Sequence, residues 1–418
     1  MHEAPRAAVS STVPPFEVRR GDLSPPDAAW TFEWLLGSVP VDTFREVYWA
    51  KHPLLVRGSP DHAFRSLIAP KDIESMLAIP SVLQEKMISM RGRGDKISLA
   101  PASISELYRL FRLGSWLQFR KMERFLPSDS PLSQLYRDLQ IVLGHPGVSI
   151  SCFFSPPGSE QIGPHYDATE IFTLQVAGRK RWRFFHRVDA EERAACDAAS
   201  LGSPTAEFEL GPGDFLYQPR GLVHEVICGD TLSVSIPLIV EPVAWKDLLY
   251  LLVEHLRHRP EFLEALPAGI LLRPDAADRL AEGIAERAVA IAREASSIDA
   301  DAFADAAGAR VLAGLGAPLG GHVAGLLSER NIGPRTLLRT RHGGAWQAHI
   351  RDDNAFLTVG GGDSLKGPSS ILPALRAIMT RNAPAEAGAL HESLTEPSSL
   401  ILARELVRIG ALTQVGDN

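Results

Sequence analysis

The sequence predicts an α+β protein with a jelly-roll or double-sheet β-barrel core and helices on either side of it in the chain. Short runs of alternating or wholly apolar residues, separated by turn-forming residues, follow one another between about residues 114 and 240. Such a series of short strands is typical of jelly rolls. Apolar residues at helical spacing precede this region from about residue 28 and return after residue 245.

The segment before the strands is mostly helical in pattern. Apolar spacing predicts helices over 30–36, 41–50 and 71–77, and the apolar run at 53–57 predicts a short strand. Residues 1–26 are rich in proline and serine and lack the apolar stretch of a signal peptide, so we expect a flexible terminus there.

The strand region contains two predicted hairpins. Glycine marks each turn: Ala177-Gly178 in the first, and Gly211-Pro212-Gly213-Asp214 in the second. Strands are expected at 148–154, at 171–176 and 181–185 (first hairpin), at 208–210 and 215–217 (second hairpin), and at 232–236.

The remainder returns to helices and then changes once more. Expected helices lie at 248–256, 276–295, 302–315, 369–380, 385–390 and 398–409, and expected strands at 347–350 and 355–359. The last part fits a small winged-helix-like module. We therefore divide the chain into a flexible N-terminus (1–26), a strand-rich domain with its helical flank (27–240), a helical region (241–333) and the winged-helix-like domain (334–418).

Composition excludes several classes of protein. The net charge of −7 argues against an electrostatic nucleic-acid binder, and it suits a basic protein partner, although solubility explains it equally well. No apolar run is long enough to span a membrane, so the cytosol is the expected location. Cys152, Cys196 and Cys228 lack the spacing of a disulfide framework or a zinc ribbon.

Two potential metal ligands, His165 and Asp167, are two residues apart. On a strand their side chains project from the same face and can reach one ion. His224, after the second predicted hairpin, is the natural third ligand, and two histidines with one carboxylate are typical of non-haem Fe(II) oxygenases. Taken singly, each residue fits a surface turn or a loop histidine at least as well.

Lys180 lies at the start of the strand after the first predicted turn. In such an oxygenase, the far carboxylate of 2-oxoglutarate needs a buried cation, and Lys180 could supply that charge. Because Lys180 stands within Arg179-Lys180-Arg181, a solvated surface cluster is the alternative interpretation.

An ordered set of motifs resembles the JmjC-type cupins of the ribosomal-oxygenase group. Residues 44–56 resemble the N-terminal signature of that group. The resemblance covers nearly the whole chain and is strongest over residues 155–237. The motifs are Pro156-Pro157-Gly158-Ser159, Gly163-Pro164-His165-Tyr166-Asp167, Phe172, Leu174-Gln175-Val176, Gly178-Arg179-Lys180-Arg181-Trp182-Arg183 and the run from Gly211-Pro212-Gly213-Asp214 through Pro219-Arg220-Gly221 to His224-Glu225.

The resemblance implies a double-stranded β-helix (cupin) core, a helical dimerisation region and hence a homodimer. It also implies iron at His165, Asp167 and His224, and a 2-oxoglutarate salt bridge at Lys180. Thr173 and Ser235 are expected as lesser contacts to the cosubstrate.

The sequence departs from that group near the expected substrate. Some members carry Asn and Tyr on the strand before the proline-rich turn, where Ser151 and Phe153 stand here, so we expect Phe153 to line a modified cosubstrate pocket. The segment 225–230 after His224 is also shorter than in some relatives.

The winged-helix-like tail raises the question of DNA binding. From Arg335 onward nine basic residues are balanced by eight acidic ones, and the last helix is mostly apolar. No basic stripe for phosphate contacts results, so we expect a structural or protein-contact role and no direct DNA binding.

Three functions remain open. The first is a hydroxylase acting on a side chain of a ribosomal or other basic protein, with demethylation of an N-methyl group as a variant. The second is a hydroxylase of a peptide or small-molecule natural product, which the changes at Ser151 and Phe153 keep open. The third is a non-catalytic cupin used for assembly, against which the presence of all three ligands and Lys180 argues.

Overall fold

The structure is a computed structural model that describes residues 9–10, 16–26, 29–58, 63–92, 99–159, 163–189, 192–315, 327, 329–341, 345–361, 363–381 and 383–415. The chain forms two compact units, Met1–Pro242 and Val243–Asn418. The second unit contains both the predicted helical region, from residue 243 to 333, and the predicted domain 334–418. The separation of these two regions into domains therefore stays a prediction.

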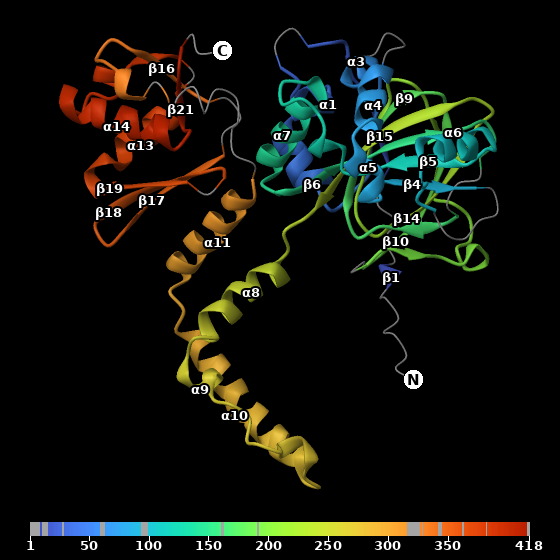
Figure 1. Ribbon diagram of the computed structural model, residues 1–418. Coiled ribbons are helices and arrows are strands. Elements are labelled where there is room, and N and C mark those ends of the chain that lie inside the picture. The colour runs from blue at the N-terminus through green and yellow to red at the C-terminus, as the bar shows by residue number, and fades with distance from the viewer. Residues whose placement is uncertain are drawn as a thin grey trace. The chain divides into compact units, whose positions relative to one another are not determined.

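Two β-sheets build the first unit (Figure 1). The smaller sheet contains β1 (Val9–Ser10), β8 (His165–Tyr166), β10 (Lys180–Val188), β11 (Ala194–Ala195), β12 (Ala206–Leu210) and β14 (Leu222–Cys228). Its order is β1-β10-β14-β8-β11, and β12 also pairs with β10. This sheet carries the strands on which both histidines of the predicted metal site lie.

The larger sheet contains β2 (Glu17–Arg20), β3 (Leu54–Arg57), β4 (Ile88–Arg91), β5 (Trp116–Phe119), β6 (Gly147–Ile150), β7 (Cys152–Ser155), β9 (Glu170–Ala177), β13 (Phe215–Gln218) and β15 (Ser233–Glu241). Its order is β2-β3-β13-β9-β15-β7-β5-β4, and β6 also pairs with β15. The predicted strand 148–154 is thus two strands, which meet at Ser151.

Both predicted hairpins are wrong, and for the same reason. β9 and β10 follow one another in the chain but lie in different sheets, and so do β12 and β13. The turn residues are where we expected them, since Gly178 has a φ of 64° and Gly213 a φ of 89°. Because a glycine turn reverses the chain without choosing its partner strand, the same signal serves a hairpin and a crossing between sheets. This alternation between two sheets fits the jelly-roll class.

Helices pack beside the larger sheet and close its core. They are α1 (Phe32–Leu36), α2 (Val41–Thr43) with the π-helix η1 (Phe44–Tyr48), α3 (Phe64–Leu67), α4 (Pro70–Leu77), α5 (Pro80–Gln84), α6 (Ile104–Arg112) and α7 (Pro131–Leu143), with the short 3₁₀ turn η2 (Met122–Arg124). Another 3₁₀ turn, η3 (Ala198–Ser200), follows β11. Phe32 and Phe44 from these helices are fully buried against Phe172 and Tyr217 of the sheet. Edge-to-face packing of large rings of this kind anchors the helices on the strands.

The predicted flexible terminus, 1–26, differs from the structure where the structure describes it. β2 pairs in parallel with β3. Phe16 stacks on Phe208 with ring centroids 4.7 Å apart, and Leu23 is fully buried. The proline and serine content suggested disorder, but apolar side chains placed between these residues hold the segment on the sheet. Residues 1–8 and 11–15 lie outside the described ranges.

The second unit begins with α8 (Trp245–Leu256), α9 (Pro260–Leu263), η4 (Ile270–Leu272), α10 (Ala276–Ser296), α11 (Ala300–Gly314) and η5 (Glu329–Asn331). It ends with β16 (Leu337–Thr340), β17 (Trp346–Arg351), β18 (Asn354–Val359), β19 (Ser364–Pro368), η6 (Ser369–Ile371), α13 (Leu372–Met379), β20 (Ala385–Glu386), η7 (Ala387–Ala389), α14 (Glu396–Arg408) and β21 (Leu412–Gln414). Two three-stranded sheets form, β20-β16-β21 and β17-β18-β19. The helix predicted at 385–390 is wrong, because β20 pairs there with β16 and a single 3₁₀ turn follows.

In the described part of the chain, no helix is long and apolar enough to cross a membrane. Mixed helices and strands around a two-sheet core confirm the coarse fold class, whereas the dimerisation role of 241–333 and the winged-helix assignment of 334–418 stay predictions.

Candidate metal centre

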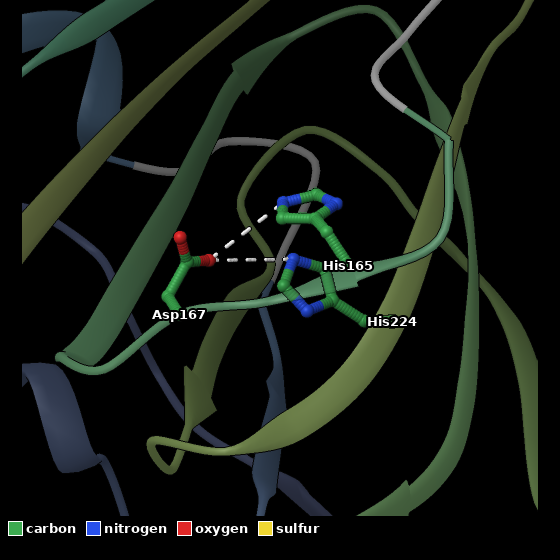
Figure 2. Close-up of side chains that lie close together, drawn as sticks. All are labelled: His165, Asp167 and His224. Carbon is green, nitrogen blue, oxygen red and sulfur yellow. Dashed lines mark ion pairs between the residues drawn. The ribbon is translucent and has the colours of Figure 1, made fainter. Parts of the chain in front are cut away.

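The three predicted metal ligands converge at one point (Figure 2). His165 lies on β8 and His224 on β14, where the two residues are direct partners in the antiparallel pairing. Asp167 follows β8, and its Oδ2 lies 3.7 Å from Nε2 of each histidine. Because one potential ligand atom of each residue lies within 4.8 Å of the others, the three side chains could hold one ion.

Each imidazole is oriented by the backbone next to it. Nδ1 of His165 donates to the carbonyl of Gly163 at 2.8 Å, and Nδ1 of His224 donates to the carbonyl of Leu222 at 3.0 Å. Carbonyl oxygens only accept, so each Nδ1 carries the proton and each Nε2 has a free lone pair directed to the centre. Such hydrogen bonds are the usual means of fixing a metal-binding histidine.

Burial keeps both rings neutral. It lowers the pKa of His165 to about 2, with the neighbouring His224 as a second cause. It also lowers the pKa of His224, against an opposing contribution from Asp167. Neutral imidazole is the form that binds a metal ion, so the site is prepared for a cation.

Two further side chains hold His224, and neither was singled out in the sequence. Nε2 of the Gln218 amide, at the end of β13, is placed 2.8 Å from Nδ1 of His224; because a protonated Nδ1 only donates, a hydrogen bond forms there with the amide turned so that its oxygen accepts. The Trp182 ring stacks on the imidazole with centroids 5.7 Å apart and planes 19° apart. Both residues stand inside motifs that resemble the ribosomal oxygenases, which was the available signal.

Asp167 is fixed at both its side chain and its backbone. Arg193 donates from Nε to Oδ1 at 2.9 Å, and the Gly221 N–H donates to the Asp167 carbonyl at 2.8 Å. Gly221 has a φ of 76°, and a Cβ on it would come within 2.0 Å of the Val188 carbonyl oxygen. Only glycine fits this position, which explains why Gly221 precedes β14.

Lys180 lies inside the fold, and the surface alternative for it is wrong. Its side chain is 4% exposed; Nζ donates to the Ser235 hydroxyl at 3.1 Å and lies 5.5 Å from the centre of the Phe153 ring. Burial lowers its pKa. No ion pair of Lys180 occurs within the described ranges, so this buried lysine faces the cavity without a carboxylate.

One cavity of about 670 Å³ joins these groups. Its lining includes the three potential ligands and Lys180, together with Thr173, Ser235 and Phe153, which were expected from the sequence. Ser151 does not line it; its hydroxyl accepts from Nε2 of Gln118 at 3.5 Å. The cavity volume is ordinary for a site that takes a small molecule.

Comparisons with known proteins find similarity over the part of the chain that carries this site. Residues 131–246 match the family model of the JmjC domain. Ribosomal oxygenase 1 of Rattus norvegicus is 31% identical over 214 residues, which are 49% of this chain and 35% of that protein. Ribosomal oxygenase 2 of Rattus norvegicus is 30% identical over 238 residues, 52% of this chain and 49% of that protein.

A bifunctional lysine-specific demethylase and histidyl-hydroxylase NO66 of Aedes aegypti is 27% identical over 238 residues, 54% of this chain and 37% of that protein. The chain therefore spans less than half the length of each of these relatives. The resemblance to the JmjC-type ribosomal oxygenases is confirmed.

Solved structures show the same fold over most of the chain. The ribosomal oxygenase YcfD of Escherichia coli, in complex with cobalt and 2-oxoglutarate, superposes with a TM-score of 0.51 at 18% identity, over 91% of this chain and 99% of that one. A second YcfD structure gives a TM-score of 0.53 at 17% identity, with 90% and 99% covered. At this identity, the likeness establishes the fold.

Proposed function

We propose that this chain, whose residues 131–246 form a JmjC domain, is an Fe(II)- and 2-oxoglutarate-dependent oxygenase that hydroxylates a protein side chain. One observation carries the proposal. Two neutral histidines and a carboxylate meet in the same cavity as a buried lysine that has no carboxylate partner among the described residues. A metal site and a site for a dicarboxylic acid thus lie side by side.

The donor set fits Fe(II). Nε2 of His165, Nε2 of His224 and the Asp167 carboxylate are the proposed ligands, and such a triad leaves positions free for other ligands of the ion. Arg193 occupies Oδ1 of Asp167, so Oδ2 alone faces the histidines. This contact favours binding through one carboxylate oxygen and keeps the remaining positions free.

The residues around Lys180 fit 2-oxoglutarate. Nζ of Lys180 would bind its far carboxylate, Ser235 and Thr173 would donate hydroxyl hydrogen bonds, and Phe153 would pack against its carbon chain. Burial removes water from this ion pair, which strengthens it. Bound iron would supply the oxidation, in which dioxygen hydroxylates a C–H bond and 2-oxoglutarate becomes succinate and carbon dioxide.

A protein substrate is favoured by the relatives, which are named ribosomal oxygenases and a histidyl-hydroxylase. A ribosomal protein is therefore the leading candidate, and demethylation is a variant of the same chemistry. The second candidate substrate is a peptide or small-molecule natural product. It is favoured by two changes from some members of the group, which carry Asn and Tyr at the positions of Ser151 and Phe153. Here Phe153 lines the cavity and Ser151 does not.

The second unit is proposed to serve assembly. Large apolar side chains are exposed along its helices, among them Trp245, Leu249 and Tyr250 on α8, and pairing with a second copy would cover them. We assign residues 241–333 to a homodimer contact and 334–418 to a winged-helix-like domain without direct DNA binding. The cytoplasm is the proposed location.

The function is tested by turnover. The chain is incubated with Fe(II), 2-oxoglutarate and dioxygen, and succinate is measured; His165→Ala is the control. We expect succinate from the parent alone. Ribosomal proteins from a strain that lacks this gene are then analysed by mass spectrometry. The search is for a ribosomal protein whose mass is lower by one oxygen atom than in the parent strain. No succinate from the parent under any condition contradicts the oxygenase, and unchanged ribosomal masses favour the second candidate.

A further inference from the structure

One wall of the cavity is formed by β4 and β5, which pair antiparallel with Ile88 opposite Phe119. Trp116, Gln118 and Arg120, at every second position of β5 and its continuation, all line the cavity. Alternate residues of a strand project from one face, so this face of β5 is turned to the cavity. From the turn before the neighbouring strand, Lys86 reaches the same cavity.

This wall is positively charged. The Arg120 guanidinium donates from Nη2 to the carbonyl of Lys86 at 2.9 Å, which holds it beside that lysine. Both side chains are exposed, and neither forms an ion pair with any residue that the structure describes. A cation at the mouth of a cavity attracts an anion and repels another cation.

The rest of the cavity does not neutralise this charge. Among the described residues that line it, the cations are Lys86, Arg120, Lys180 and Arg193, and the carboxylate is Asp167. Asp167 is already engaged by Arg193 and by the metal site. The cosubstrate would engage Lys180, so Lys86 and Arg120 are left for the substrate.

A buried donor on the same strand points to the same kind of ligand. Trp116 is 3% exposed, lines the cavity, and its indole Nε1–H has no hydrogen-bond partner among the residues that the structure describes. Buried donors in native proteins are nearly always paired, so this one calls for an acceptor oxygen from a ligand. Trp116 and Arg120 are four positions apart on one strand, about 13 Å, so this acceptor is a different oxygen from the one that the cations bind.

We infer that Lys86 and Arg120 form a subsite for a substrate carboxylate, and that Trp116, further along β5, donates to a second acceptor oxygen of the same substrate. The hydroxylated residue then has an acidic group beside it and is not itself Lys or Arg. This inference rests on the proposed function and narrows it. A target protein that is basic overall would present an acidic or neutral segment to this cavity. The carboxylate could belong to a protein segment or to a small acid.

Two matched sets of synthetic peptides test the inference. In each set the central residue of the peptide is varied. In one set it is flanked by two glutamates, and in the other by two lysines. Free glutamate serves as the small-acid probe. Dissociation constants are measured by fluorescence polarisation for the peptides and by competition for free glutamate. Titrations are done with and without Fe(II) and 2-oxoglutarate, without oxygen. We expect the glutamate set to bind at least about tenfold more tightly than the lysine set.

Variants assign the preference to this wall. Arg120→Glu should remove or reverse it, whereas Lys121→Glu, an exposed neighbour that does not line the cavity, should leave it unchanged. Trp116→Phe should weaken binding of the glutamate set several-fold without affecting the lysine set. Peptides that bind more tightly than free glutamate indicate a protein segment, and equal affinity indicates a small acid.

The subsite would be overturned if the two peptide sets bound equally, if neither bound, or if the lysine set bound more tightly. It would also be overturned if Lys121→Glu lost the preference for glutamate as Arg120→Glu does. The proposed function fails separately. If the parent binds no Fe(II) and 2-oxoglutarate, the oxygenase is wrong, but the peptide preference is still measured in the absence of both.

Discussion

The two parts of the cavity are built in different ways. In the metal centre, His165, Asp167 and His224 are buried or nearly so, and each is held by a backbone hydrogen bond within the same sheet or turn. At the β4–β5 wall, Lys86 and Arg120 are exposed side chains with few contacts. The difference indicates that the metal centre is rigid and carries out the same reaction on each substrate. The side chains of the β4–β5 wall can adapt, and they determine which substrate binds. Changes in the first should abolish activity, and changes in the second should alter selectivity.

The largest effect is expected from His224→Ala. This removes one of three proposed ligands and leaves Gln218 and Trp182 around an empty position. Bound iron and succinate formation should fall below detection, while the circular dichroism spectrum and melting temperature stay close to those of the parent. Iron content per chain, measured after gel filtration, checks this. Retention of one equivalent of iron would contradict the assignment of His224.

The next effect is expected from Lys180→Ala. Loss of a buried charge partner costs about 2–5 kcal/mol, so the affinity for 2-oxoglutarate should fall by more than tenfold while iron still binds. Lys180→Arg is the matched control, because it keeps the cation and should recover part of the affinity. Calorimetric titration with 2-oxoglutarate measures both. Equal affinity in Lys180→Ala and the parent would place the dicarboxylic acid elsewhere.

A smaller effect is expected from Gln218→Ala. The Gln218 amide lies against Nδ1 of His224, and loss of a side chain that orients a ligand typically costs about 10–100-fold in metal affinity. Competition with a chelator measures the iron affinity. The matched change Arg120→Ala, at the mouth, should leave iron affinity unchanged. If both variants lose iron equally, the contrast between the two parts of the cavity does not hold.

The smallest effect on the chemistry is expected from Tyr217→Phe. The Tyr217 hydroxyl donates to the fully buried Glu170 at 2.5 Å, and Glu170 also accepts from the Arg220 N–H, so this network holds the turn before β14. Burial raises the pKa of Tyr217 well above its ordinary value, so this hydroxyl stays protonated and keeps donating. We expect about 1–3 kcal/mol less stability in urea unfolding, with iron binding retained. No change in stability would show that the network is dispensable.

The sequence predicted which three side chains converge, His165, Asp167 and His224, better than it predicted the sheet pairing. The spacing of His165 and Asp167 and the glycine turn before His224 are local features, and local features survive whichever strand pairs with which. Pairing itself is not local: Gly178 and Gly213 marked turns correctly, but nothing near them showed that the chain crosses to the other sheet.

The support around the centre was also beyond sequence reasoning. Arg193 meets Asp167 only because β11 pairs with β8, and Trp116 meets the cavity only because β5 joins the larger sheet. Contacts of this kind depend on tertiary structure. Lys180 illustrates the same point, since a cluster of three basic residues indicated surface as readily as pocket until the structure showed that its side chain is buried.

The central claim is that the metal and the dicarboxylic acid bind side by side. Fe(II) and 2-oxoglutarate are added to the chain without oxygen, and the visible spectrum is searched for a metal-to-ligand charge-transfer band. We predict a band in the parent, none in His165→Ala, and in Lys180→Ala a band that requires a higher 2-oxoglutarate concentration. A parent chain that binds Fe(II) but shows no band at saturating 2-oxoglutarate would contradict the claim.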